Sequence, residues 1–153
     1  ETGADIVLGE MVEYHEKIKQ KQIRNLAKSI EYDEVIGGEG AALSELLRKN
    51  NFFWEVCGKI YSRAVLDSAM KDLVKIDRHV IMGEDMLFNF HFFYYCKKLA
   101  RADLALYYYL INEGSITAKS ADIGKKQRII QDLQFVFETI KSFMDQKSSK
   151  ILY

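Results

Sequence analysis

The residues from Met86 to Cys96 form an almost continuous apolar run, which only Asn89 and His91 interrupt. A helix with apolar side chains around most of its circumference has to be buried on most sides. We therefore expect this segment to be the central helix of a domain. The chain has 153 residues, of which 48% are hydrophobic, and it is long enough for one domain with a core of ordinary size.

Other apolar patterns predict the elements around this helix. Strands are expected at residues 6–8 and 11–14, as one strand or as two with a bulge or turn at Gly9, and at residues 104–110 with both faces covered. Helices are expected at residues 41–49, from about residue 62 to residue 70, and at residues 125–146. The pattern indicates the α/β class. The lysine-rich residues 15–29 favour a solvated hairpin or loop.

Three details of this pattern concern the core. The helix at 41–49 has Ala42, Leu43, Leu46 and Leu47 at helical spacing, and Phe52-Phe53-Trp54 should return the chain to the core. In the last helix, Ile129, Leu133, Val136, Ile140 and Phe143 follow one another at intervals of four, three, four and three residues. This apolar stripe has to pack against another surface.

The balance of charges argues against some classes of partner. Lysine and arginine number 22, as do aspartate and glutamate, so no general basic surface exists to bind nucleic acid or an anionic membrane. Cys57 and Cys96 have neither the spacing of zinc ligands nor that of a disulfide framework, which favours reduced, buried thiols in a cytosolic protein. No window of 18 apolar residues and no signal-peptide pattern is present, so we expect a soluble chain.

Two adjacent carboxylates, Glu84 and Asp85, stand directly before the central apolar run. One interpretation is structural, because acids are favoured in the first turn of a helix by the free backbone N–H groups and the helix dipole. The other is chemical: one carboxylate points into a cleft and acts as a general base that removes a proton from an attacking hydroxyl group. The residues alone leave both interpretations open.

Several further side chains are candidates for binding. Lys59 and Arg63 are four residues apart and would present two cations on one side of a turn or short helix, or would simply be solvated. His79 and His91 lack partners at metal-ligand spacing; we expect His91 to be a core residue among phenylalanines and His79 to be nearer the solvent. The run Tyr107-Tyr108-Tyr109 is typical of strand packing.

Four of these segments, taken in order, carry a resemblance to a known family. They are Gly3-Ala4-Asp5-Ile6-Val7, the segment from Trp54 through Lys59 to Arg63, Gly83-Glu84-Asp85-Met86-Leu87-Phe88-Asn89-Phe90, and Leu106-Tyr107-Tyr108-Tyr109 followed by Gly114-Ser115-Ile116-Thr117. Together they resemble the second half of a family 2 glycosyltransferase of the GT-A type. Leu110 departs from the family, which commonly has an arginine there.

The resemblance implies a function and a division of the chain. Residues 1–117 would be the acceptor-side half of the transferase domain, the C-terminal part of a GT-A-like mixed sheet, and residues 118–153 a helical extension. Asp85 would be the base and Glu84 would help to position the acceptor or the helix start. Trp54, Lys59, Arg63, His79 and Ser115 would line the acceptor or diphosphate region, and no metal ligand is expected among the residues present.

The resemblance also implies what lies outside the chain. The nucleotide-binding half, with its divalent metal (Mg²⁺ or Mn²⁺) and nucleotide-sugar donor, would precede Glu1, so the isolated chain should bind a nucleotide-sugar poorly and turn nothing over. The acceptor would be a glycan or a lipid-linked sugar in bacterial cell-envelope polysaccharide assembly, in the cytoplasm or at its membrane. The competing hypothesis is a noncatalytic interaction module, in which the last helix packs on a partner or, through Ile140 and Phe143, on a second copy of the chain.

Overall fold

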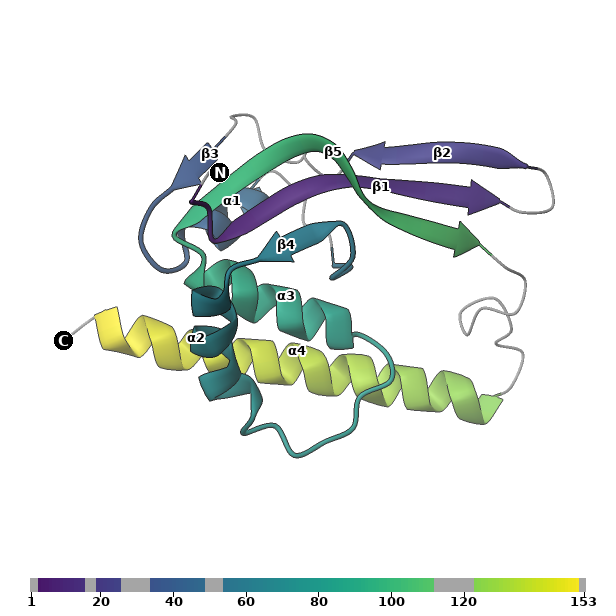
Figure 1. The fold of residues 1–153 in the computed structure, drawn as a ribbon. Helices are drawn as coiled ribbons and strands as arrows, with labels where there is room; N and C mark the ends of the chain where they lie inside the picture. Colours follow the sequence, from purple (N-terminus) through teal and green to yellow (C-terminus); the bar gives the residue numbers. More distant parts are fainter. Residues whose placement is uncertain (1–2, 16–18, 26–33, 49–53, 112–122, 152–153) are drawn as a thin grey trace.

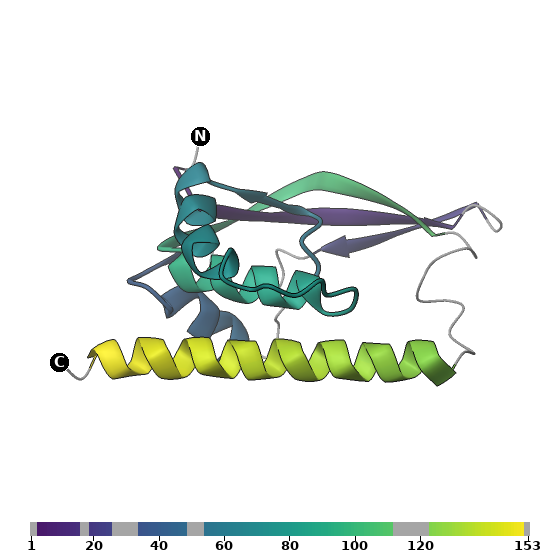
Figure 2. The ribbon, with the colours of Figure 1, turned by 90° about the horizontal axis from the view of Figure 1, so that it is seen from below.

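The computed structural model describes residues 3–15, 19–25, 34–48, 54–111 and 123–151. In chain order the elements are β1 (Ile6–His15), β2 (Gln20–Asn25), β3 (Glu34–Ile36), α1 (Ala41–Arg48), β4 (Lys59–Tyr61), α2 (Arg63–Leu73), α3 (Glu84–Tyr95), β5 (Lys98–Ile111) and α4 (Ile123–Ile151). Within the described residues they form a mixed α/β fold with one sheet of five strands, and α3 lies between this sheet and α4 (Figures 1 and 2).

Strand β1 is the centre of the sheet. Along one edge it pairs in parallel with β5. Along the other edge, its residues Ile6–Leu8 pair antiparallel with β4 and its residues Glu10–His15 pair antiparallel with β2. Strand β3 pairs antiparallel with the start of β5. The first strand prediction is confirmed as one continuous strand, and the hairpin predicted in the lysine-rich segment is confirmed for β2.

Gly9 marks the irregularity expected in β1, but the extra residues belong to β5. Three steps along β1, from Leu8 to Met11, match six steps along β5, from Arg101 to Tyr107, so β5 bulges outward there. A Cβ atom on Gly9 would lie 2.4 Å from Cγ of Leu106. Glycine is therefore required because the bulge brings a β5 side chain onto the backbone of β1.

Helix α3 forms the middle of the core, as predicted. Met86, Leu87, Phe90, Phe92, Phe93 and Tyr94 are all buried. His91 is also buried, with its ring centroid 4.2 Å from that of Phe143 on α4, so the prediction of a core histidine is confirmed. The apolar stripe of α4 packs inside the fold, because Val136 and Phe143 are part of the same hydrophobic core.

Three of the expectations about burial are wrong. One is the Cys57 thiol, which is partly exposed where a buried thiol was expected. Leu47 is exposed because α1 presents only Ala42, Leu43 and Leu46 to the core. Trp54 is 40% exposed, and its backbone carbonyl group is held against α3 by Asn89. Phe52 and Phe53 lie outside the described residues.

Three element predictions need correction. Residues 98–111 form a longer strand than expected. The side chains from 107 to 110 are exposed, because β5 runs with β1 and β2 beyond the N-terminal end of α3 (Figure 1). Lys59 belongs to strand β4 and Arg63 to helix α2, so the two cations do not share one turn or helix. Helix α2 also continues through Lys71 and Asp72, because Asp72 bonds Tyr95. The proposed boundary at residue 117 lies outside the described residues.

None of the helices in the described part of the chain has both the length and the apolar character needed to cross a lipid bilayer.

Candidate active site

The start of α3 is fixed by a glycine. Gly83 is the N-cap residue, with φ of 88°, a left-handed conformation that favours glycine. A Cβ atom there would lie 3.1 Å from Cδ2 of Leu133 and 3.5 Å from Cγ2 of Val136, both on α4. Glycine thus lets the chain turn sharply while it touches α4, and this turn places Glu84 and Asp85 in the first turn of α3.

Asp85 faces the segment of residues 54–58 that precedes β4. Its Oδ2 atom accepts a hydrogen bond from the backbone N–H of Val56 at 3.4 Å, and both groups are partly buried. The free N–H groups at the start of α3 and the helix dipole favour a negative charge at this position. A partly accessible carboxylate held in this way can accept a proton from a hydroxyl group brought next to it.

Asn89, which lies one helical turn after Asp85 on α3, holds the segment that faces Asp85. The side chain of Asn89 is 0% exposed; its Nδ2 donates to the carbonyl oxygen of Trp54, and its Oδ1 accepts from the hydroxyl of Tyr61 at 2.8 Å. The hydroxyl of Tyr61 also lies 3.2 Å from the carbonyl oxygen of Val56. Sequence analysis recorded Asn89 only as a break in an apolar run; the available signal was that a buried amide needs partners.

Strand β5 reaches the same segment from the sheet. The Tyr107 side chain interacts with the thiol of Cys57, and this interaction raises the pKa of Tyr107. The ring of Tyr109 lies 6.5 Å from that of Tyr107. The exposed rings of Trp54 and Tyr107 therefore belong to the surroundings of the segment that contacts Asp85.

The structure separates the remaining predicted site residues. Lys59 belongs to the same neighbourhood, because its Nζ donates to the carbonyl oxygen of Glu55, the residue before Val56. Arg63 is exposed and pairs with Asp67 at 2.8 Å within α2. The carbonyl oxygen of His79 accepts from Arg128 of α4 at 3.0 Å. Ser115 and Thr117 lie outside the described residues.

A second polar cluster, which sequence analysis missed, joins α2, α3 and α4. The hydroxyl of Tyr95 donates to Asp72 at 2.5 Å, and Lys147 lies 3.3 Å from the same carboxylate. Burial opposes ionisation of Asp72, but hydrogen bonds from Tyr95 and Lys75 and the charge of Lys147 hold its pKa well below the usual value. These contacts indicate a structural role at the helix junction.

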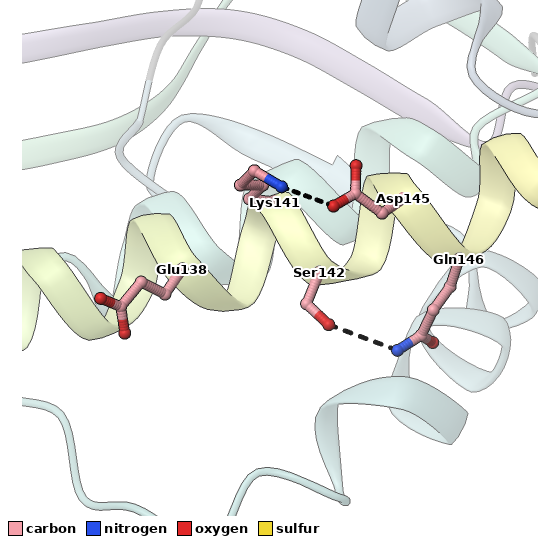
Figure 3. A pocket seen from close by; sticks show the side chains of 5 residues that line it. All are labelled: Glu138, Lys141, Ser142, Asp145 and Gln146. Atoms are coloured by element: carbon pink, nitrogen blue, oxygen red, sulfur yellow. Dashed lines mark hydrogen bonds and ion pairs between the residues drawn. The ribbon is translucent and has the colours of Figure 1, made fainter.

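A third polar feature, a hollow of about 450 Å³, lies along α4. It is lined by Glu138, Lys141, Ser142, Asp145 and Gln146. Figure 3 shows these side chains on one side of a single helix, where Lys141 pairs with Asp145 at 2.7 Å and Gln146 bonds Ser142 at 3.4 Å. Its charged groups satisfy one another along the helix, so the Asp85 region is the better candidate for chemistry.

No group of three or more His, Cys, Asp or Glu side chains in the described ranges is arranged to hold a metal ion. Comparisons with protein-family models, with curated proteins and with solved structures gave no match.

Proposed function

We propose that this chain is the acceptor-side half of an inverting family 2-type glycosyltransferase, with Asp85 as the general base. The observation that carries the proposal is the position of Asp85, which lies at the N-terminus of a buried helix and is oriented by the backbone amide of Val56 toward a partly exposed aromatic segment. The order of the sequence motifs around it, which resembles that family, adds the reaction class.

In the proposed reaction, Asp85 takes the proton of an acceptor hydroxyl group as the hydroxyl oxygen forms a bond to the anomeric carbon of the donor sugar. The bond from that carbon to the nucleoside diphosphate breaks, and the diphosphate leaves with the electron pair. Attack from the opposite face inverts the anomeric configuration. The donor and its divalent metal ion would be held by residues upstream of this chain, the metal ion offsetting charge on the diphosphate.

The acceptor in this proposal is a glycan or lipid-linked sugar. The partly exposed rings of Trp54 and Tyr107 near the Asp85 segment are suited to pack against the apolar face of a sugar ring. Glu84, the first residue of α3, would help to position the acceptor or the helix start. Arg63 pairs with Asp67 and the carbonyl group of His79 bonds Arg128, so the proposed site does not include these two residues.

The wider setting follows from the resemblance alone. Enzymes of this type act in the assembly of cell-envelope polysaccharides on the cytoplasmic side of the membrane, and the partner of this chain would be the nucleotide-binding half of the same polypeptide. Accordingly, the isolated chain should not bind UDP- or GDP-sugars with micromolar affinity in Mg²⁺ or Mn²⁺, which calorimetry would measure.

The stereochemistry of the product tests this proposal. The protein extended upstream along its reading frame, hereafter the upstream-extended protein, would be given a panel of nucleotide-sugars and acceptors. The first product would be examined by NMR before any anomerisation. The proposal expects inversion at the anomeric carbon; retention of configuration would exclude a single displacement assisted by Asp85.

A second candidate, a noncatalytic dimerisation module, has one observation in its favour. Ile123, Ile130 and Phe137 recur every seven residues on α4 and are each more than half exposed. They lie about 100–160° around the helix from Val136 and Phe143. Phe143 is buried in the core, so it is not a dimer contact as the sequence had suggested. Light scattering after chromatography would find a dimer that Ile130→Gln with Phe137→Gln abolishes, if this module exists.

A further inference from the structure

Asn89 is an unusual residue for its position in the fold. It lies on α3 close in sequence to the buried Phe90, Phe92 and Phe93, and is itself inaccessible to solvent. A buried amide without hydrogen-bond partners strongly disfavours folding, whereas an apolar residue at this position would need none. The structure satisfies both ends of the Asn89 side chain, through the carbonyl oxygen of Trp54 and the hydroxyl of Tyr61.

Tyr61 completes the arrangement from β4. Its ring packs on that of Phe92 at 5.0 Å between centroids, which fixes the ring on α3. Burial, followed by the charge of Asp85 and the neighbouring Cys57, raises the pKa of Tyr61. The hydroxyl therefore keeps its proton at neutral pH and stays a donor to Asn89 or to the carbonyl oxygen of Val56.

Residues 54–56 are thus held at successive points. Asn89 holds the carbonyl group of Trp54, Tyr61 approaches the carbonyl group of Val56, and the N–H group of Val56 donates to Asp85. The backbone of Val56 therefore connects Tyr61 and Asn89 to the Asp85 carboxylate. If the hydrogen bonds of Tyr61 and Asn89 were lost, the N–H group of Val56, which orients Asp85, would move.

We propose that the pair formed by the buried Asn89 and the partly buried Tyr61 is a positioning device, which clamps residues 54–56 against α3 and so sets the orientation of the Asp85 carboxylate and the place of the Trp54 ring. Neither residue touches the reacting atoms; both act through the Val56 peptide. The catalytic meaning of the clamp depends on the proposed transferase function, whereas the clamp itself does not.

The chain carries two reporters on the clamped segment. Trp54 is the one tryptophan of the sequence, so intrinsic tryptophan emission comes from this segment alone. Cys57 is partly exposed, while Cys96, the other cysteine, is buried and burial raises its pKa to about 12. A thiol reagent at neutral pH therefore reads the accessibility of Cys57.

The decisive variant is Tyr61→Phe, which keeps the ring that packs on Phe92 and removes one hydroxyl group. Tyr95→Phe is the matched control, because it removes a hydroxyl that also bonds a side chain across the helices, but on the Asp72 side of α3. Asn89→Leu is the stronger variant and removes both bonds of the amide.

The proposal expects the Cys57 thiol in Tyr61→Phe to react about fivefold faster than in the parent, the effect of one lost hydrogen bond on local opening. The Trp54 emission should shift to longer wavelength, with the far-ultraviolet circular dichroism unchanged. Tyr95→Phe should change neither reporter. Parent-like thiol reactivity and emission in folded Tyr61→Phe would overturn the clamp, even if Asn89→Leu did not fold.

Measurements of kcat and KM test the catalytic role of the clamp separately from the clamp itself. In an active upstream-extended protein, Tyr61→Phe should lower kcat about tenfold with the KM for the donor unchanged, because a small displacement of a catalytic group slows the chemical step. Changed reporters with parent-like kcat would refute the positioning role. An inactive parent across the donor panel, with changed reporters in Tyr61→Phe, would instead count against the transferase proposal and leave the clamp standing.

Discussion

Asp132→Asn is expected to lower the free energy of unfolding by about 3 kcal/mol. The carboxylate of Asp132 on α4 is 0% exposed; it accepts from Arg78 at 2.9 Å, from Arg128 at 3.2 Å and from the backbone N–H of Ile81 at 3.0 Å. The hydrogen bond from Ile81, followed by the two arginines against the opposing effect of burial, lowers its pKa. Asparagine keeps one acceptor oxygen, but its NH2 group faces either the backbone N–H of Ile81 or the two guanidinium donors, and the negative charge that pairs with the arginines is lost.

The magnitude follows from the exposure of the partners. Breaking a buried ion pair costs about 3–5 kcal/mol, and we take the lower end because the side chains of Arg78 and Arg128 remain 33% and 46% exposed. For a two-state chain of this length, that loss lowers Tm by about 9 °C.

Calorimetry or thermal circular dichroism would measure this change, with Asp145→Asn as the control. Asp145 lies on the same helix and pairs with Lys141 at 2.7 Å, but both side chains are largely exposed. Asp145→Asn should leave Tm within experimental error of the parent. If the two variants lowered Tm equally, the idea that Asp132 anchors residues 78–81 to α4 would be refuted.

Three other changes have expected outcomes. Gly83→Ala should lower the free energy of unfolding by about 1 kcal/mol in urea titrations, because alanine is strained at φ of 88° and its Cβ atom would also press on Leu133; a parent-like midpoint would contradict this. Burial lowers the pKa of His91 below its ordinary value of about 6.5, so the unfolded state takes up the proton at higher pH than the folded state, and stability is lost as the pH falls below about 6.5; NMR should show that the His91 ring of the folded protein is still neutral at about pH 6, and a ring protonated at that pH would contradict this. Phe143→Ala should cost about 3–5 kcal/mol independently of protein concentration, because the ring fills the core between α3 and α4; a concentration-dependent loss would point to a dimer contact.

Helices were the part of the fold that the sequence could predict. The apolar run at α3 and the regular stripe of α4 are local patterns, and the structure places both helices within a few residues of expectation, apart from the longer C-terminal end of α4. Strand β5 was harder, because its first half contains Lys98, Arg101 and Asp103 and has no period of two. Its place in the sheet depends on pairing with β1, which is distant in sequence.

The candidate site shows the same division between local and distant information. Asp85 could be singled out because adjacent acids before an apolar helix are a local signal. Asn89 and Asp132 could not, since their partners, apart from Arg128 four residues before Asp132, lie 28 to 54 residues away along the chain. A buried polar residue looks like an interruption in a sequence, and only the fold reveals what it binds.

The most direct measurement of the proposed base is kcat of the upstream-extended protein with Asp85→Asn, beside Asp67→Asn as a control. Asp67 is an exposed acid of α2 that pairs with Arg63, so its loss should leave kcat unchanged. Removal of the base should lower kcat at least about 100-fold with the circular dichroism and Tm of a folded protein. Turnover by folded Asp85→Asn at the parent rate would contradict the account and leave the two carboxylates as residues that stabilise the start of α3.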